Sequence, residues 1–273
     1  MLFLIKDLKA HRVNLLMNDY VAGLPSPLAI LGFTDALVRA VGQKGWSGRC
    51  LPVLHEVYSS YGRTKPEMDR VSANFFSPTE IPEDMTGYVS LSLIADIPGF
   101  DDDIALADAL CGRRIAGGII QNREFSVETV PYDGTVFKKV SRGSIIAPYV
   151  ADGSATVFGG TEEEFAAFSE ILFPALRAPN SGWIIPVAAG YRLLEDTATV
   201  PKRERTRDAS LPHVFAEPLS GAAKLISVRN PALVKLDRDG LSELLWSWTV
   251  RDDFILGHSA YLPSTTLKES TND

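Results

Sequence analysis

Apolar positions in the first half of the chain follow strand spacing in three places. Residues 2–8 are apolar over most of their length and predict a buried strand. Residues 51–58 predict a second strand, and residues 87–95 alternate between apolar and polar side chains, as in a strand with one buried face. The pattern therefore predicts a sheet whose strands are joined in part by helices.

The segment between the first two strands predicts a helix with both ends marked. A polar connection over residues 11–23 leads to Ser26, which can cap the first amides, and to Pro27, which suits the first helical position. Gly42 supplies the end of this helix. Few positions between these ends are polar, so we expect the helix to pack on the sheet, with Gly32 allowing a close approach by a neighbouring element.

A second helix is predicted after the third strand. Residues 101–103 are aspartates, which are favoured at the positive end of a helix dipole, and the helix ends near Gly112. A fourth strand then continues from residue 113 to Val130. The order strand, helix, strand, strand, helix, strand is that of the ferredoxin-like unit. The predicted fold class is therefore α+β, with a ferredoxin-like, RRM-like domain at residues 1–131.

Residues 132–273 predict a smaller, β-rich region with some helix that packs on the first domain. Apolar runs, turn residues and acidic helix starts predict strands at 136–140, 144–150 and 221–228, a short interrupted strand from residue 183, and helices at 165–176 and 240–248. No internal repeat or low-complexity segment divides the chain further.

Composition and charge narrow the class of protein. The 273 residues are 45% hydrophobic and carry a formal charge of −7, which argues against a nucleic-acid binder with a globally basic surface. Any such site must therefore be local. Cys50 and Cys111 form no disulfide framework, and no apolar run is long enough to span a membrane. We expect a soluble, cytoplasmic protein.

The sequence contains no pattern that indicates catalysis or a bound cofactor. The four histidines have no metal-ligand spacing, and no nucleophile elbow or nucleotide-binding glycine motif is present. The aspartates at 101–103 could hold a cation, but a helix start explains them fully. We therefore expect no catalytic residue, no metal and no cofactor.

Binding of single-stranded RNA asks for less than catalysis, namely cations and accessible backbone along a phosphate track. A solvated loop is the more common explanation for any one local cluster of basic residues, but the glycine pair beside two arginines favours binding because it allows close approach by phosphate. If extended, the alternating run near residue 205 places its arginines on one side. The candidate RNA-binding residues are Arg63 and Lys65; Arg113, Arg114, Gly117 and Gly118; Lys202, Arg203, Arg205 and Arg207; and His11, Arg12 and Asn14 of the polar connection.

Four segments of the chain carry a resemblance to a known family. They are residues 24–33 with the helix after them, residues 114–118, residues 182–191 and residues 244–246. The turn at 62–65 and the basic run at 202–208 also fall where that family has similar stretches. In these segments and their order the sequence resembles the subunit of type I-F CRISPR surveillance complexes that holds the 5′ handle of the guide RNA (crRNA).

The resemblance implies a RAMP fold, an RRM-like fold in which Arg114, Gly117 and Gly118 form a glycine-rich loop after the second helix. It implies a subunit without nuclease activity that binds the crRNA 5′ handle, caps the backbone filament and contacts the backbone-forming and large subunits. In some variant complexes this subunit also contacts target DNA near the PAM, the short motif beside the target. Residues 130–181 look shorter than usual, which indicates a compact variant or the related type IV subunit.

Two other functions stay open at this point. The first is a metal-independent RNA endonuclease of the same fold that processes CRISPR repeat RNA, with His11 or His55 and Tyr58 as acid and base. The second is a scaffold that contacts only proteins, with Trp183, Trp246 and Trp248 as interface anchors. Cleavage of repeat RNA would favour the first, and absence of RNA from the purified protein would favour the second.

Overall fold

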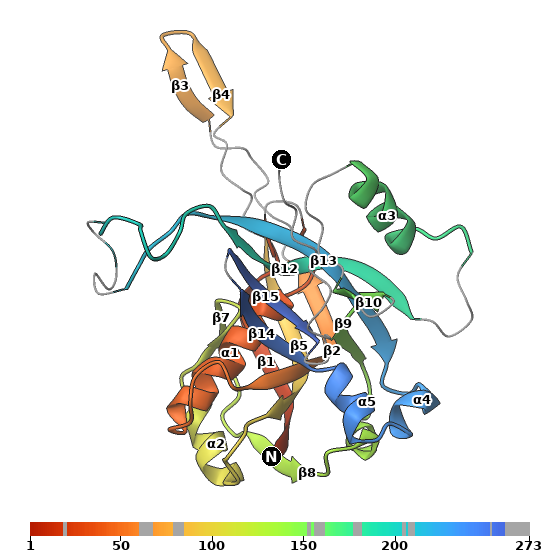
Figure 1. Ribbon diagram of the computed structural model, residues 1–273. Coiled ribbons are helices and arrows are strands. Elements are labelled where there is room, and N and C mark those ends of the chain that lie inside the picture. Colours follow the sequence, from red (N-terminus) through yellow and green to blue (C-terminus); the bar gives the residue numbers. More distant parts are fainter. Residues whose placement is uncertain are drawn as a thin grey trace.

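One large sheet of eleven strands organises the chain in the computed structural model (Figure 1). All strand pairs in this sheet are antiparallel among the residues that the structure describes. These residues are 1–18, 21–59, 68–78, 85–151, 154–155, 162–176, 182–203, 206, 211–251 and 253–259.

The first half of the chain supplies the centre of the sheet. Four strands lie in the order β2-β5-β1-β8, and the helices α1 and α2 follow β1 and β5 along the chain, as the sequence pattern predicts. Two short hairpins, β3–β4 and β6–β7, are inserted into this order. The elements are β1 (Leu2–Asn14), α1 (Pro27–Ala40), β2 (Arg49–Ser59), β3 (Met68–Ser72), β4 (Phe75–Pro78), β5 (Thr86–Asp96), α2 (Asp103–Ala109), β6 (Arg114–Ile115), β7 (Gly118–Ile120) and β8 (Ser126–Val130).

The second half extends the same sheet on the side of β2. The strand β9 pairs with β2, and the order continues outward through β13, β12, β15 and β14, so strands from both sides of the predicted boundary at residues 131 and 132 share one sheet. The elements are η1 (Gly134–Lys139), β9 (Ser144–Pro148), β10 (Val150–Ala151), β11 (Ser154–Ala155), α3 (Glu162–Leu172), β12 (Trp183–Leu193), β13 (Ala216–Ser227), α4 (Pro231–Val234), α5 (Arg238–Glu243), β14 (Trp246–Arg251) and β15 (Phe254–Ser259). No helix in the described part of the chain is both long and apolar enough to cross a membrane.

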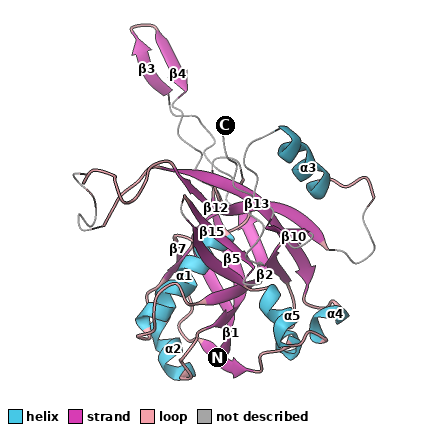
Figure 2. Cartoon of the chain, in the orientation of Figure 1, coloured by secondary structure: helices cyan, strands magenta, loops and turns pink. Residues whose placement is uncertain are grey.

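Both faces of the central sheet are buried at the end where β1 begins. Phe3 and Ile5 belong to a core with the buried side of α1, whereas Leu4 and Val53 belong to a second core on the opposite face. That second core includes Leu241 of α5, and Figure 2 shows α1 and α2 on one side of the strands and α4 and α5 on the other. The alternation of side chains along each strand therefore separates two cores, with helices over both.

The strand β1 is longer than the sequence pattern predicts. It continues through residues 11–14, which were expected to belong to a polar connection. Its pairing with β5 shifts register after Ile5 and again after Ala10, and Asp7 and Arg12 have positive φ angles of 50° and 56°. Each bulge changes which face the following side chains occupy, so the alternation that identifies a strand in the sequence is broken twice.

Three predictions for the second half are wrong in element type or length. Residues 134–139 form the 3₁₀ helix η1, where a strand was expected. The strand β12 runs uninterrupted from Trp183 to Leu193, and it carries a register shift beside Gly190 that accommodates the glycine inside the strand. The predicted helix at 240–248 ends at Glu243, and Trp246 begins β14. For β12 and β14, pairing with distant strands outweighs the local pattern, whereas η1 starts at a local cap, where the Asp133 side chain accepts from the Thr135 amide.

The ends of α1 agree with the predicted helix, but two details of the prediction are wrong. Pro27 is its first residue, and Gly42 follows it with a φ of 75° that favours glycine. Ser26, however, makes no capping hydrogen bond through its side chain with any described residue. No described atom lies within 4 Å of where a Cβ on Gly32 would stand, so no neighbouring element requires glycine there.

A buried ion pair between β2 and β5 is connected by hydrogen bonds to the second half of the chain. Asp96 of β5 is 4% exposed, and its Oδ2 accepts hydrogen bonds from Arg49 Nε at 2.9 Å and Nη2 at 2.5 Å. Arg49 Nη1 also donates to Ser242 Oγ at 2.8 Å, and the Tyr132 hydroxyl donates to the same Asp96 oxygen at 3.1 Å. The Asp96 carboxylate thus accepts hydrogen bonds from Arg49 of β2 and from Tyr132, which lies just before η1. Arg49 in turn is held by Ser242 of α5.

Replacing Arg49 tests this connection. Arg49→Ala leaves the Asp96 carboxylate buried with fewer donors, and we expect the free energy of unfolding to fall by about 3 kcal/mol. Arg142→Ala is the matched control, because Arg142 pairs with Glu56 at 2.7 Å in an exposed position and its loss should cost about 1 kcal/mol or less. Denaturant unfolding of both variants measures the difference. Equal losses would contradict a special role for the buried pair.

Candidate functional site

The predicted glycine-rich loop is the tip of the β6–β7 hairpin. Ala116 and Gly117 form its two-residue turn, and both have positive φ angles, 46° and 78°. This conformation is typical of the tight turns that suit the twist of a hairpin, and Gly117 takes it without steric strain. The Asn14 amide donates to Ala116 O at 2.8 Å and holds the tip against the end of β1.

The two glycines of this hairpin have different surroundings. A Cβ on Gly118 would stand 2.5 Å from Val13 Cγ2 and 2.9 Å from His11 O, so the backbone of β1 is what approaches Gly118 closely. A Cβ on Gly117 would meet no described atom within 4 Å. There is therefore room for the predicted approach of a phosphate at Gly117, whereas Gly118 is required for packing inside the protein.

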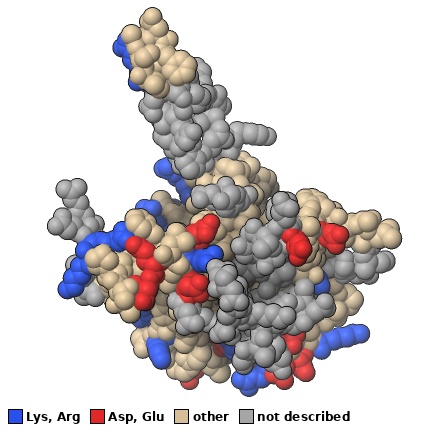
Figure 3. Space-filling view, turned by 45° about the horizontal axis from the view of Figure 1, so that its top comes forward, with Lys and Arg blue, Asp and Glu red and all other residues tan. Residues whose placement is uncertain are grey.

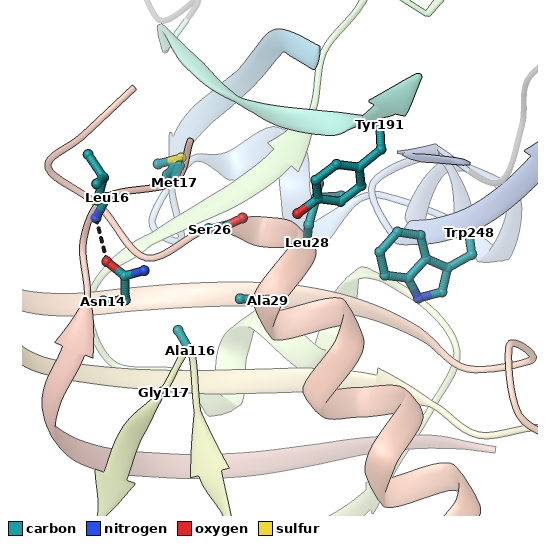
Figure 4. Close-up of a pocket in the computed structure, with 10 residues that line it drawn as sticks. All are labelled: Asn14, Leu16, Met17, Ser26, Leu28, Ala29, Ala116, Gly117, Tyr191 and Trp248. Carbon is teal, nitrogen blue, oxygen red and sulfur yellow. Dashed lines mark hydrogen bonds between the residues drawn. The ribbon is translucent and has the colours of Figure 1, made fainter. Parts of the chain in front are cut away.

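The tip of the hairpin borders an open cleft of about 340 Å³ (Figure 4). Its walls come from segments that are far apart in the sequence: the end of β1, the start of α1, the hairpin turn, β12 and β14. The lining residues are Asn14, Leu16, Met17, Ser26, Leu28, Ala29, Ala116, Gly117, Tyr191 and Trp248.

The two sides of the cleft differ in chemistry. Tyr191 and Trp248 present aromatic rings, with Asn14 and the hairpin turn across from them (Figure 4). The start of α1 lies between the two sides. Its first turn closes with a hydrogen bond of 3.1 Å from the Ile30 amide to Ser26 O. A helix start favours negative charge, and aromatic rings favour flat apolar groups. The cleft therefore suits a ligand that combines the two, as a nucleotide does.

Several predicted RNA-binding residues lie near this hairpin. His11 is exposed on β1, and its ring packs edge-on against Tyr88 at 4.9 Å between centroids. Arg12 and Arg114 are also exposed, whereas Arg113 turns back to donate from Nε to Ala109 O of α2 at 3.1 Å. The structure thus brings His11, Arg12, Asn14, Arg114 and Gly117 into one region, although sequence separates them into two groups.

The basic run near residue 205 is only partly described. Lys202 is exposed, but Arg203 is held by its own chain: Nη2 donates to Glu195 Oε1 at 2.5 Å and Oε2 at 2.7 Å. The Arg203 guanidinium also lies 4.1 Å from the centroid of the Phe215 ring. These contacts give Arg203 an intramolecular role. The other predicted residues, Arg63, Lys65, Arg205 and Arg207, lie outside the described residues.

The histidine proposed as an acid or base is enclosed by partners. The His55 side chain is 2% exposed, Nε2 lies 2.7 Å from Ser92 Oγ, and Nδ1 lies 2.9 Å from Arg142 O. Burial lowers the pKa of His55 below its ordinary value, although the Arg142 carbonyl and Asp7 oppose this shift. Both ring nitrogens are therefore engaged inside the fold, away from any RNA on the surface.

The tryptophans proposed as interface anchors fall into different environments. Trp246 is buried and donates from Nε1 to Ile146 O at 2.7 Å, so it is a core residue. Trp183 is exposed, and Trp248 lines the cleft and packs edge-on against Trp46 at 5.4 Å. The sequence did not indicate Tyr191 or Trp248 as RNA-binding residues, because only strand pairing in the second half brings them to the hairpin.

The described residues form no metal site, and Cys50 is not a reactive thiol. Within the described ranges, no three or more His, Cys, Asp or Glu side chains are grouped so that they could hold a metal ion. Burial raises the pKa of the Cys50 thiol to about 12, so this thiol stays protonated in the core.

Comparison with known proteins adds one match. Residues 162–255, from the start of α3 into β15, match the model of a protein family described as CRISPR-associated protein (Cas_Csy2). The matched segment includes Tyr191 and Trp248 of the cleft. No curated protein matches the chain. Over this segment the chain is therefore similar to CRISPR-associated proteins.

The lowered pKa of His55 predicts a specific loss of stability in acid. The unfolded chain takes up a proton near pH 6.5, whereas the folded protein does so only at lower pH. The unfolded state therefore binds more protons between these two values, and the stabilisation present above pH 6.5 is lost as the pH falls through the folded pKa. Denaturant unfolding of wild type and His55→Gln across this range should show a smaller acid loss in the variant. Parallel curves would contradict the assignment.

Proposed function

We propose that this protein is a non-catalytic RNA-binding subunit of a type I-F-like CRISPR surveillance complex, and that it holds the 5′ handle of the crRNA. One observation carries the proposal: the segment that matches the CRISPR-associated family supplies Tyr191 and Trp248 to the same cleft that Asn14 and Gly117 reach from the N-terminal half. The family match and the predicted RNA-binding loop thus meet at one place in the structure.

The order of the central strands supports the proposal. The antiparallel order β2-β5-β1-β8, with both α1 and α2 joining strands of this group, is the arrangement of the ferredoxin-like unit. We infer that the protein has the RAMP version of this fold. In this version, the hairpin tip after α2 takes the place of the glycine-rich loop, and Gly117 is its accessible residue.

The distribution of charge limits how the protein can hold RNA. Figure 3 shows Lys and Arg side chains in separate groups on the face in view, with Asp, Glu and uncharged residues between them. The net charge of −7 gives no general attraction for a polyanion. A bound handle must therefore rely on a defined site, as the cleft and the exposed Arg12 and Arg114 provide.

The proposal includes partners as well as RNA. As the cap of the backbone filament, the protein would contact a backbone-forming subunit and a large subunit and would defend the cell against foreign DNA. Contact with target DNA near the PAM, and a place in a type IV complex, are the two variants of this proposal that the sequence suggested. The enclosed ring of His55 supports a role without catalysis.

Substitution at the hairpin tip tests the RNA-binding role. Gly117→Val places a branched side chain at the border of the cleft and at a φ of 78°, so we expect the complex purified from cells to retain less crRNA. Gly112→Val is the matched control, because Gly112 has a φ of 69° with open space around it and lies outside the cleft lining. Thermal melting checks that both variants fold. Equal RNA retention in the two would remove Gly117 from the site.

The absence of catalysis is tested directly. We expect labelled CRISPR repeat RNA to stay intact when it is incubated with the purified protein, with or without magnesium, because His55 is enclosed and both of its ring nitrogens are engaged by Ser92 and Arg142. A specific cut that disappears in His11→Ala would favour the endonuclease hypothesis instead.

A further inference from the structure

A row of side chains crosses five strands of the sheet near the hairpin. Arg114 of β6 stands opposite Ile119 of β7, Ile119 stands opposite His11 of β1, and Tyr88 of β5 stands opposite Tyr58 of β2. His11 lies in the second bulge of β1, after Ala10, which pairs with Val89, and before Val13, which pairs with Gly87. Its ring contacts Tyr88, the residue between those two partners. Residues that stand directly opposite in antiparallel strands share a face, so Arg114, Ile119, His11, Tyr88 and Tyr58 form one row, the stacking row.

The stacking row lies on the face of the sheet opposite α1 and α2. The neighbours of its members along the chain, Ala10, Val57, Val89 and Ile115, all pack in the core beneath those helices. Side chains alternate along a strand, so the row points the other way. Tyr58 is 62% exposed and Ile119 is 50% exposed, so this end of the face is open to solvent.

The aromatic part of the row presents three rings in succession. The centroids of His11 and Tyr88 are 4.9 Å apart with the rings edge-on, and those of Tyr88 and Tyr58 are 6.0 Å apart with the rings tilted by 32°. Each pair fixes the orientation of its members, so the rings are ordered before a ligand arrives. Exposed rings held across adjacent strands are what unpaired nucleobases stack on.

The charges around the row favour RNA over a neutral partner. Arg114 forms one end of the row and Arg12 adjoins His11, and both are exposed. Of the nearby carboxylates, Glu56 is paired with Arg142 at 2.7 Å, and Asp7 lies at the first bulge of β1, 3.7 Å from His55 Nε2. Guanidinium groups beside aromatic rings match alternating phosphates and bases along a single strand.

We propose that the stacking row binds consecutive unpaired bases of single-stranded RNA, with Arg12 and Arg114 facing its phosphates. This inference rests on the proposed RNA-binding function and adds a second surface to it. The β6–β7 hairpin joins the two surfaces, because its turn borders the cleft on one side while Arg114 and Ile119 belong to the row on the other. An RNA strand that follows the hairpin can therefore contact both.

Binding of two probes to the full chain tests the proposal. The probes are a fluorescent oligoadenylate RNA and an abasic oligomer of equal length, which has the phosphates without the bases. We expect wild type to bind oligoadenylate more tightly, and Tyr58→Leu and Tyr88→Leu each to weaken that binding by about tenfold while leaving the abasic oligomer unchanged. Tyr58→Phe and Tyr88→Phe keep the rings and should retain wild-type affinity.

The control and the contradicting results separate this inference from the proposed function. Phe173→Leu removes another exposed aromatic side chain, after α3, and should change neither affinity. If wild type binds both probes equally, or if the Tyr58→Leu and Tyr88→Leu variants bind oligoadenylate normally, the stacking row does not bind bases, while RNA binding itself stands. If wild type binds neither probe, the RNA-binding function fails and this inference fails with it. Loss of a partner subunit in these variants without loss of RNA would assign the row to a protein interface.

Discussion

The two bulges of β1 are the constraint on which the rest of the structure depends. This strand pairs with β5 along one edge, while its other edge is divided between β8 near its start and β7 near its end. Without the bulges, the side chains of a strand of this length would alternate regularly between the two faces of the sheet from end to end. The second bulge turns His11 and Arg12 outward while Val13 returns to the core, and it brings the β1 backbone against Gly118. The position of the hairpin, and with it the cleft and the stacking row, follows from that contact.

Burial of charge serves a different purpose at the opposite end of the sheet. The carboxylate of Asp96 is removed from water, which is costly unless donors replace the lost hydration. Those donors come from Arg49 and from Tyr132, just before η1, and burial is the main cause that raises the pKa of the Tyr132 hydroxyl, so it remains a donor. A buried ion pair adds little net stability, but losing one partner is costly, so the geometry of the pair must be kept. It therefore fixes how η1 and α5 sit against β2 and β5, and α5 leads directly into β14, which carries Trp248.

Local signals in the sequence predicted the parts of the fold whose causes are local. Pro27 and Gly42 mark the ends of α1, and the alternation at residues 87–95 identifies β5. The length of β1 could not be predicted, because two bulges interrupt its alternation, and η1 was taken for a strand because its apolar residues are equally suited to either. For the site, the sequence indicated Gly117, Asn14 and His11 as RNA-binding residues but could not indicate Trp248 or Tyr88 in that role. Those residues reach the site through register between strands that lie far apart in sequence, and register is set by the whole sheet.

Arg203 shows why basic residues alone are a weak guide to the RNA site in this protein. It lies in the densest basic run of the chain, yet its guanidinium is neutralised by Glu195 and stacked on Phe215. In a chain with 34 acidic and 27 basic residues, other arginines of the described structure, such as Arg39, Arg49 and Arg142, also pair with carboxylates, and a paired cation contributes less to the release of counterions from a bound strand. Affinity for RNA must then come largely from contacts that do not depend on charge. Aromatic stacking supplies such contacts, and it depends little on salt because the bases carry no charge. The combination of an acidic protein, two exposed arginines at the hairpin and rings on both of its sides is therefore physically consistent with RNA binding.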